Sequence, residues 1–160
     1  MEYPYFPLFV SLKGQKVLTA GAGAVAVRRV KALAEFGACV TVVAPACGAE
    51  FERLLDGCGS EGPGCIVWRR RLFQEADLDG MSLVLAATDD PELNSRIASL
   101  CRERNIPVNN SSRKEESDFY FPGIARDGEL VIGVAASGQD HRLVRETVQK
   151  LKRWLLEGRN

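Results

Sequence analysis

The sequence predicts an α/β fold in which a doubly wound parallel sheet is followed by a small antiparallel hairpin and a C-terminal helix. Short apolar runs rich in β-branched residues alternate with helical periodicity over about residues 12 to 111, which is typical of parallel strands covered on both faces. A glycine-rich turn, Gly21-Ala22-Gly23, separates the first run from the first helical pattern. After Phe119 the pattern changes to two short runs around Asp127-Gly128, as in a hairpin.

The elements of the sheet follow in order along the chain. Gly37 ends the first helix, which begins near Ala24, and Pro45 closes the second strand, because glycine and proline disfavour continuation of these elements. We expect strands at residues 16–20, 39–44, 65–69, 83–87 and 106–108, and helices at 51–55, 91–104 and 142–156. Residues 56–64 form a loop rich in glycine.

Composition bounds the class of protein. A chain of 160 residues holds one domain with a modest appendage. Lys and Arg total 21 and Asp and Glu also total 21, so no basic excess favours nucleic acid. No run reaches the ~18 apolar residues of a membrane helix, and the N-terminus lacks a secretory pattern. Five cysteines without a C-x-x-C pair indicate free thiols and a cytoplasmic protein.

The turn after the first strand carries the first chemical signal. Residues 21–26 fit G-x-G-x-x-A, in which Gly21 permits the tight turn and Gly23 lets a pyrophosphate approach the backbone. Ala26 is small enough for close packing of helix on strand. The following helix would direct its free N–H groups at the phosphates. Placed within a strand-helix-strand unit, the pattern predicts a Rossmann-like domain that binds NAD; the alternative is a glycine turn that serves packing alone.

The usual acidic residue that binds the ribose 2′-hydroxyl is missing. It is expected near the end of the second strand, where the sequence reads Val43-Ala44-Pro45. No arginine stands there to favour a 2′-phosphate either. This position therefore leaves NAD and NADP undistinguished.

A second polar segment, beginning with Thr88 and Asp89, follows the fourth strand. We expect Asp89 to cap the next helix, with Glu92 three residues later and Pro91 in the first turn. Because ligands bind at the carboxyl ends of parallel strands, Thr88 and Asp89 would also face the cofactor.

Four motifs in the same order resemble the precorrin-2 dehydrogenase family, which includes the N-terminal part of bifunctional siroheme synthases. The resemblance runs over about residues 4 to 155. The motifs are Tyr5-Phe6-Pro7-Leu8-Phe9 before Leu12-Lys13-Gly14, the turn and helix start from Gly21 to Arg29, Ala86-Ala87-Thr88-Asp89-Asp90 with Asn94, and Phe119-Tyr120-Phe121-Pro122 leading to Gly128-Glu129-Leu130.

The resemblance implies a function, a cofactor and a partner. Members oxidise precorrin-2, a tetrapyrrole, to sirohydrochlorin with NAD, and some also insert ferrous iron. Members are homodimers whose strands after the nucleotide domain interlock. By position, Ala24 and Val25 match residues beside the pyrophosphate, and Pro45 and Ala46 match residues near the adenosine. We therefore expect an NAD-binding domain over residues 1–112 and a dimerisation hairpin with a C-terminal helix over 113–160.

The sequence departs from the family at its key acidic residue. The family's aspartate, ten residues before Pro122, is Ser112 here, and an unactivated serine is a poor base near neutral pH. Asp118, Glu115 and Glu116 follow in the same loop. We expect Ser112 and Asp118 at the catalytic position. The alternative is a non-catalytic homologue that binds NAD or a tetrapyrrole as a carrier, sensor or assembly partner.

His141 and the run of arginines at residues 69–71 each have two possible interpretations. The single histidine, His141, either begins the last helix at the surface or binds iron, and we expect no metal site of the protein itself. The run Arg69-Arg70-Arg71 is either a solvated face or, with Arg113, Lys114 and Arg126, a binding surface for tetrapyrrole carboxylates.

Overall fold

A computed structural model describes residues 5–136 and 140–157. Contacts divide them into two compact units, one of residues 11–120 and one of residues 121–157 with residues 5–10. The division expected from the sequence assigns residues 113–120 to the appendage. In the structure they belong with the sheet, since the Asp118 N–H donates to the Val108 carbonyl at 2.8 Å and the Asn109 side chain donates to the Phe119 carbonyl at 2.7 Å.

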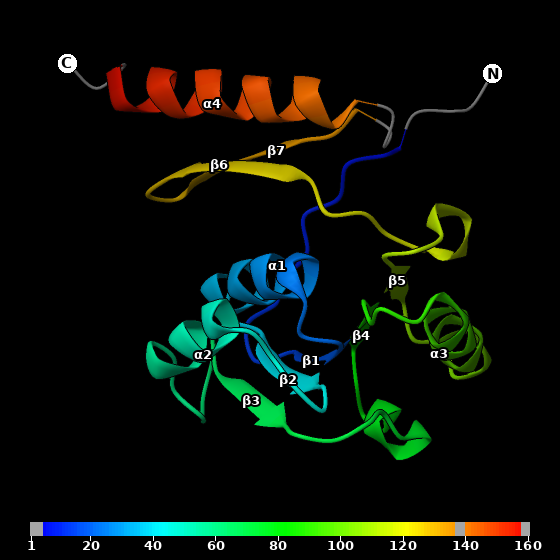
Figure 1. Cartoon of the computed structure of the whole chain (residues 1–160). Helices are drawn as coiled ribbons and strands as arrows, with labels where there is room; N and C mark the ends of the chain where they lie inside the picture. Colours follow the sequence, from blue (N-terminus) through cyan, green and yellow to red (C-terminus); the bar gives the residue numbers. More distant parts are fainter. Residues whose placement is uncertain (1–4, 137–139, 158–160) are drawn as a thin grey trace. The chain divides into compact units, whose positions relative to one another are not determined.

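The larger unit is a parallel sheet with helices on it (Figure 1). Its order is β3-β2-β1-β4-β5, formed by β1 (Lys16–Ala20), β2 (Cys39–Val43), β3 (Ile66–Arg69), β4 (Leu83–Ala86) and β5 (Val108–Asn110). The helices are α1 (Ala24–Glu35), α2 (Ala49–Asp56) and α3 (Pro91–Glu103). The predicted Rossmann-like fold class is confirmed.

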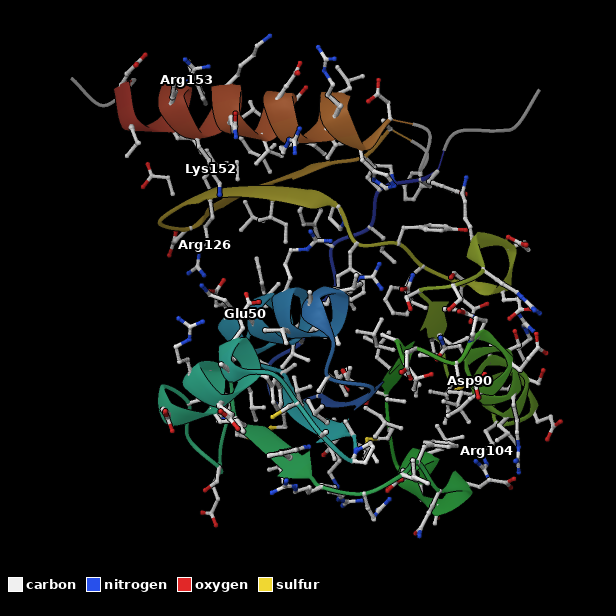
Figure 2. All side chains as sticks on the ribbon, in the orientation of Figure 1. Glu50, Asp90, Arg104, Arg126, Lys152 and Arg153 are labelled. Carbon is white, nitrogen blue, oxygen red and sulfur yellow. The ribbon has the colours of Figure 1, made fainter. Side chains whose placement is uncertain are left out.

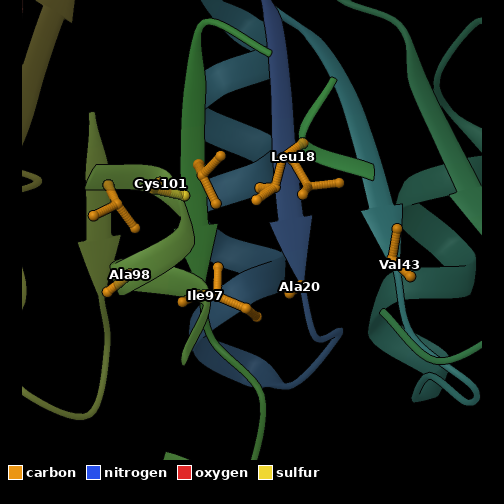
Figure 3. Packing of buried hydrophobic residues seen from close by; sticks show 10 residues of the cluster. Leu18, Ala20, Val43, Ile97, Ala98 and Cys101 are labelled. Atoms are coloured by element: carbon orange, nitrogen blue, oxygen red, sulfur yellow. The ribbon is translucent and has the colours of Figure 1, made fainter. Parts of the chain in front are cut away.

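The core lies on both faces of the sheet. Leu18 and Ala20 of β1 pack with Ile97, Ala98 and Cys101 of α3 (Figure 3). The alternating residues Val17 and Thr19 are equally buried. A strand buried on both faces must be apolar at nearly every position, which explains the continuous apolar runs in the sequence.

The fifth strand lies two residues later than the sequence predicts. The expected range, 106–108, overlaps β5 only at Val108. Pro107 has no N–H for the ladder, although its carbonyl accepts from the Val84 N–H at 3.0 Å. Regular pairing with β4 therefore starts at Val108 and places two asparagines, Asn109 and Asn110, in a buried strand.

The segment between β3 and β4 is held by a buried carboxylate. Asp77, in a 3₁₀ helix over Glu75–Leu78, accepts from Arg69 at 2.9 Å, from Arg71 at 2.5 and 2.8 Å, and from the Gln74 N–H at 2.9 Å. Its side chain is 1% exposed. Two of the three consecutive arginines are thus engaged within the protein, which weakens the tetrapyrrole-binding interpretation of this run.

The end of α3 is tied to the same segment. The Arg104 side chain donates to the Glu75 carbonyl at 3.1 Å, and Figure 2 shows Arg104 directed towards the β3–β4 connection. Arg96 forms an ion pair with the Glu75 carboxylate at 2.5 Å. These contacts fix a β3–β4 connection whose helical part is the short 3₁₀ helix Glu75–Leu78.

The smaller unit is a hairpin packed on a helix. Its strands β6 (Gly123–Asp127) and β7 (Leu130–Val134) are antiparallel, and α4 spans His141–Glu157. The turn is Gly128-Glu129, with Gly128 at φ +57°, one residue later than the expected Asp127-Gly128. A Cβ at Gly123 would lie 2.7 Å from the side chains of Val144 and Val148, so glycine permits the close packing of β6 on α4.

Side chains of α4 point in different directions. Figure 2 shows Lys152 directed towards the hairpin and Arg153 away from it. His141 is the first residue of α4 and is exposed, in agreement with the first of its two interpretations. None of the helices within residues 5–136 and 140–157 is both long and apolar enough to cross a membrane.

The Asp77 carboxylate predicts a pH-dependent stability. The hydrogen bond from Arg71, with those from Gln74 and Arg69, lowers the pKa of Asp77 to about 2 despite burial. Asp77→Asn should therefore reduce the free energy of unfolding at pH 7 by roughly 2 kcal/mol. Since the folded pKa is depressed, this contribution is complete above the unfolded pKa of about 4 and is lost as the pH falls towards 2.

Urea unfolding of the wild type and the variant at pH 7, 5 and 3 measures this difference. Asp79→Asn is the matched control, because it removes an exposed carboxylate two residues away. A difference between wild type and Asp77→Asn that stays constant from pH 7 to pH 3 would contradict the assignment.

Candidate cofactor-binding site

The turn between β1 and α1 lies directly against the loop that follows β4. Gly21 has φ +103°, and its N–H donates to the Val43 carbonyl at 2.9 Å. A Cβ at Gly21 would overlap the Ala87 carbonyl and lie 2.9 Å from the Thr88 nitrogen. Glycine is therefore required here both by backbone conformation and by the approach of the second loop.

Among the described residues, nothing around the second glycine of the turn requires the absence of a side chain. Gly23 is exposed with φ −74°, and a Cβ added to it would have no atom within 4 Å. It is the N-cap of α1 without a side-chain cap, and the first turn contains no acidic residue. The first N–H groups of a helix have no intrahelical acceptor, so the N–H groups beginning at Ala24 and Val25 are available to an anion.

This turn fits a pyrophosphate. Ala24 and Val25 are exposed, with Val25 43% exposed, while Ala26 is buried against the sheet as the pattern predicts. The open space at Gly23 lets phosphate oxygens approach the backbone, and the helix dipole favours their negative charge. The structure thus supports cofactor binding over a turn that serves packing alone.

The expectation that Asp89 caps α3 is wrong. The cap is Asp90, whose Oδ1 accepts from the N–H groups of Glu92 and Leu93 at 2.9 and 3.2 Å. Asp90 lies at the start of α3 (Figure 2), with Pro91 as the first helical residue. Asp89 is exposed, and among the described residues its carboxylate has no hydrogen-bond or ion-pair partner.

A buried asparagine organises the end of β4. Asn94 Oδ1 accepts from the Thr88 N–H at 3.0 Å and from the Thr88 hydroxyl at 2.8 Å, and its Nδ2 donates to the Thr88 carbonyl at 3.1 Å. Asn94 Nδ2 also donates to Ser112 Oγ at 2.8 Å. Ser112 accepts in this bond, so its own proton remains available to a ligand.

The structure therefore brings Ser112 to the loop of Thr88 and Asp89. Ser112 follows β5 and is exposed, and its N–H donates to Asn110 Oδ1 at 2.8 Å. Sequence reasoning noted Asn94 only as part of a motif. The role of Asn94 depends on its side chain contacting both the Thr88 loop and Ser112 at the carboxyl edge of the sheet. No sequence pattern specifies these contacts.

Asp118 is not brought to this edge. Its Oδ2 accepts from the Val108 N–H at 2.9 Å, and Val108 begins β5, so Asp118 lies beside the amino end of the strand that Ser112 follows. Glu116 accepts from Asn110 Nδ2 at 2.7 Å. Hydrogen bonds from Asn110 and Arg113 lower the pKa of Glu116, which favours an ionised structural carboxylate rather than a base poised near pH 7.

The remaining candidate residues are spread over several places: the end of β2, the start of α3 and the hairpin of the smaller unit. Pro45 and Ala46 are exposed after β2. Arg113 pairs with Glu92 at 2.6 Å and belongs to the larger unit, whereas Arg126 is on β6 of the smaller one. Within the described part of the chain, no three His, Cys, Asp or Glu side chains are grouped as a metal site.

A family model described as "Putative NAD(P)-binding" matches residues 8–123. The chain belongs to this family. It is 38% identical over 151 residues to siroheme synthase of Pseudomonas fluorescens SBW25, covering 94% of this chain and 31% of that protein. It is 36% identical over 155 residues to siroheme synthase of Azotobacter vinelandii, covering 96% and 32%.

A solved structure supports the same placement. SirC, precorrin-2 dehydrogenase, matches with a TM-score of 0.67 and 25% identity, covering 93% of this chain and 70% of that one. The resemblance stated from the sequence motifs is confirmed, and NAD is supported as the cofactor of the domain. The chain spans about a third of the length of the curated relatives it matches.

Substitutions of the two glycines should have different effects: Gly23 variants should lose NAD affinity, and Gly21 variants should lose stability. Gly23→Val should lower NAD affinity at least about tenfold, because a branched side chain would occupy the space for phosphate, yet change stability by less than about 0.5 kcal/mol. Isothermal titration with NAD and thermal unfolding measure both quantities. The contrasting variant, Gly21→Ala, should lose stability because its Cβ overlaps the Ala87 carbonyl. If a folded Gly23→Val variant bound NAD with unchanged affinity, the assignment of the pyrophosphate to this turn would be contradicted.

Proposed function

We propose that this chain oxidises precorrin-2 to sirohydrochlorin with NAD. The observation that carries this proposal is the likeness to SirC, precorrin-2 dehydrogenase, over 93% of the chain. The likeness to siroheme synthases and the open turn at Gly23 add support. NAD, when bound, takes a hydride from the macrocycle, so precorrin-2 and NAD⁺ give sirohydrochlorin, NADH and one proton.

The residues at the carboxyl edge of the sheet divide the remaining tasks. The N–H groups at the start of α1 hold the pyrophosphate, and Asn94 orients Ser112 so that its hydroxyl donates to the substrate. Hydrogen-bond donors suit the carboxylates of a tetrapyrrole. Ser112 thus orients the substrate instead of removing its proton.

The proton released with the hydride needs an acceptor other than Ser112. Asp118, expected in this role from the sequence, already accepts from the Val108 N–H. We propose Asp89, an exposed carboxylate next to Thr88, as the proton acceptor. Its position at the carboxyl end of β4 is where ligands of doubly wound sheets bind.

Anaerobic turnover tests the activity. Purified protein with NAD and precorrin-2 should form NADH and sirohydrochlorin in equal amounts, followed by absorbance. Asp89→Asn should lower kcat by about tenfold or more, and Asp56→Asn, an exposed carboxylate at the end of α2, is the matched control. Repeating the assay with ferrous iron or cobalt examines chelation by the same chain.

The outcome separates an enzyme from a binding protein. Tetrapyrrole and NAD binding without turnover, with activity appearing only in Ser112→Asp, would support the non-catalytic alternative. Asn94 Nδ2 is already placed to donate to an aspartate at this position. Failure to bind NAD would contradict the proposed function itself.

We further propose that the chain forms a homodimer with a second copy of itself. We also propose that the protein acts in the cytoplasm. The smaller unit exposes large apolar side chains: Leu130 is 49% exposed, Leu143 53%, Trp154 60% and Leu156 80%. Leu143 and Trp154 are eleven residues apart on α4, about three turns, and therefore lie on one side of the helix; large apolar side chains exposed together favour an interface. Five free cysteines fit a reducing compartment.

Light scattering after size exclusion tests the dimer. The wild type should have twice the chain mass of 17.5 kDa, and Trp154→Glu with Leu156→Glu should shift it to a monomer that keeps its helical circular dichroism. Arg153→Gln, on the same helix, is the control and should stay dimeric. A wild type that is monomeric at 100 μM, a concentration on the order of a thousandfold above a tight Kd, would contradict the proposal.

A further inference from the structure

We infer that Arg70 forms a binding position for the 2′-phosphate of NADP, so that the cofactor site accepts NADP as well as NAD. The inference rests on the NAD-binding site of the proposed function. It concerns the adenosine end of that site, where the sequence leaves the choice between the two nucleotides open.

The position of Arg70 follows from the register of two neighbouring strands. β2 and β3 run parallel side by side (Figure 1). Val43 lies opposite Arg69 in their register, and the Ala44 N–H donates to the Arg69 carbonyl at 3.3 Å. Arg70 therefore leaves β3 beside Ala44 and Pro45. In dinucleotide-binding sheets the end of the second strand is where the ribose 2′ position is recognised.

The charges at this end of the sheet suit a phosphate better than a hydroxyl. The acidic residue that would accept from the 2′-hydroxyl is replaced by Val43-Ala44-Pro45. Arg69 and Arg71 both form ion pairs with Asp77. Arg70 is exposed, and among residues 5–136 and 140–157 it forms no ion pair, so its guanidinium is available to an anion.

An aromatic side chain holds this guanidinium in place. The Arg70 guanidinium carbon lies 5.5 Å from the centroid of the Trp68 ring, a cation–π arrangement. Trp68 Nε1 donates to the Ala44 carbonyl at 3.0 Å, and its ring meets Phe51 edge to face at 6.0 Å. A cation fixed on a rigid platform loses less side-chain entropy when it binds a phosphate.

The loop after β2 is within the electrostatic reach of Arg70. Burial raises the pKa of the Cys47 thiol, Glu52 adds to this, and the charge of Arg70 opposes it. Glu50 and Glu52 in the first turn of α2 are the opposing charges here. Both are exposed and so are screened by salt, which predicts comparable binding of the two nucleotides instead of strong preference for NADP.

Titration of the full-length chain with four probes tests the inference. NAD⁺, NADP⁺, 5′-AMP and 2′,5′-ADP are titrated calorimetrically at 50 and 300 mM NaCl. The wild type should bind NADP⁺ within about threefold of NAD⁺ at low salt, with the steeper salt dependence for NADP⁺. Arg70→Gln should weaken NADP⁺ and 2′,5′-ADP about tenfold and leave NAD⁺ and 5′-AMP within about twofold.

Two further variants complete the design. Arg70→Lys keeps the charge and should recover part of the lost NADP⁺ affinity. Arg53→Gln removes the same charge from the last turn of α2. This variant should leave the affinities for both NAD⁺ and NADP⁺ unchanged. Thermal unfolding of each variant confirms that the fold is retained.

The results separate this inference from the proposed function. Binding of NAD⁺ with NADP⁺ more than about thirtyfold weaker, or equal loss of both nucleotides in Arg70→Gln, would overturn the role of Arg70 and leave the dehydrogenase proposal intact. Binding of neither nucleotide would overturn the proposed function, and the inference with it.

Discussion

The close approach of two loops at the carboxyl edge of the sheet sets the geometry of the whole candidate site. Gly21 occupies a left-handed conformation with the Ala87 carbonyl where a side chain would be. This contact holds the start of α1 beside the end of β4, and β4 in turn pairs with β5. The glycine turn before α1, the Thr88 loop and Ser112 thereby belong to one edge of the sheet.

Hydrogen bonds of a single buried amide complete that edge. Asn94 is inaccessible to solvent and satisfies both its oxygen and its nitrogen, with Thr88 on one side and Ser112 on the other. A buried amide that lost one of these partners would be left with an unpaired polar group, which costs about 1–3 kcal/mol. The position of Ser112 is consequently a property of the sheet and of α3, more than of its own loop.

The sequence identified the features that depend on local backbone chemistry. Strand β1, the glycine turn and the ends of α1 were predicted because apolar periodicity and glycine conformation are local. Asp89 was mistaken for the cap since Asp89 and Asp90 are equally good capping residues, and only the three-dimensional start of α3 distinguishes them. Asp118 was misplaced for a different reason: the chain after β5 turns back along that strand, which side-chain type cannot reveal. Trp68 and Arg70 became informative only through the register of β2 with β3.

The proposed site requires a cofactor whose pyrophosphate lies at the start of α1, on the same edge of the sheet as Ser112. A crystal structure of the chain with NAD bound measures this directly. We predict pyrophosphate oxygens within hydrogen-bond distance, about 3 Å, of the backbone nitrogens of residues 24 and 25. A pyrophosphate bound at any other place on the chain, with the turn at Gly23 left in solvent, would contradict the account.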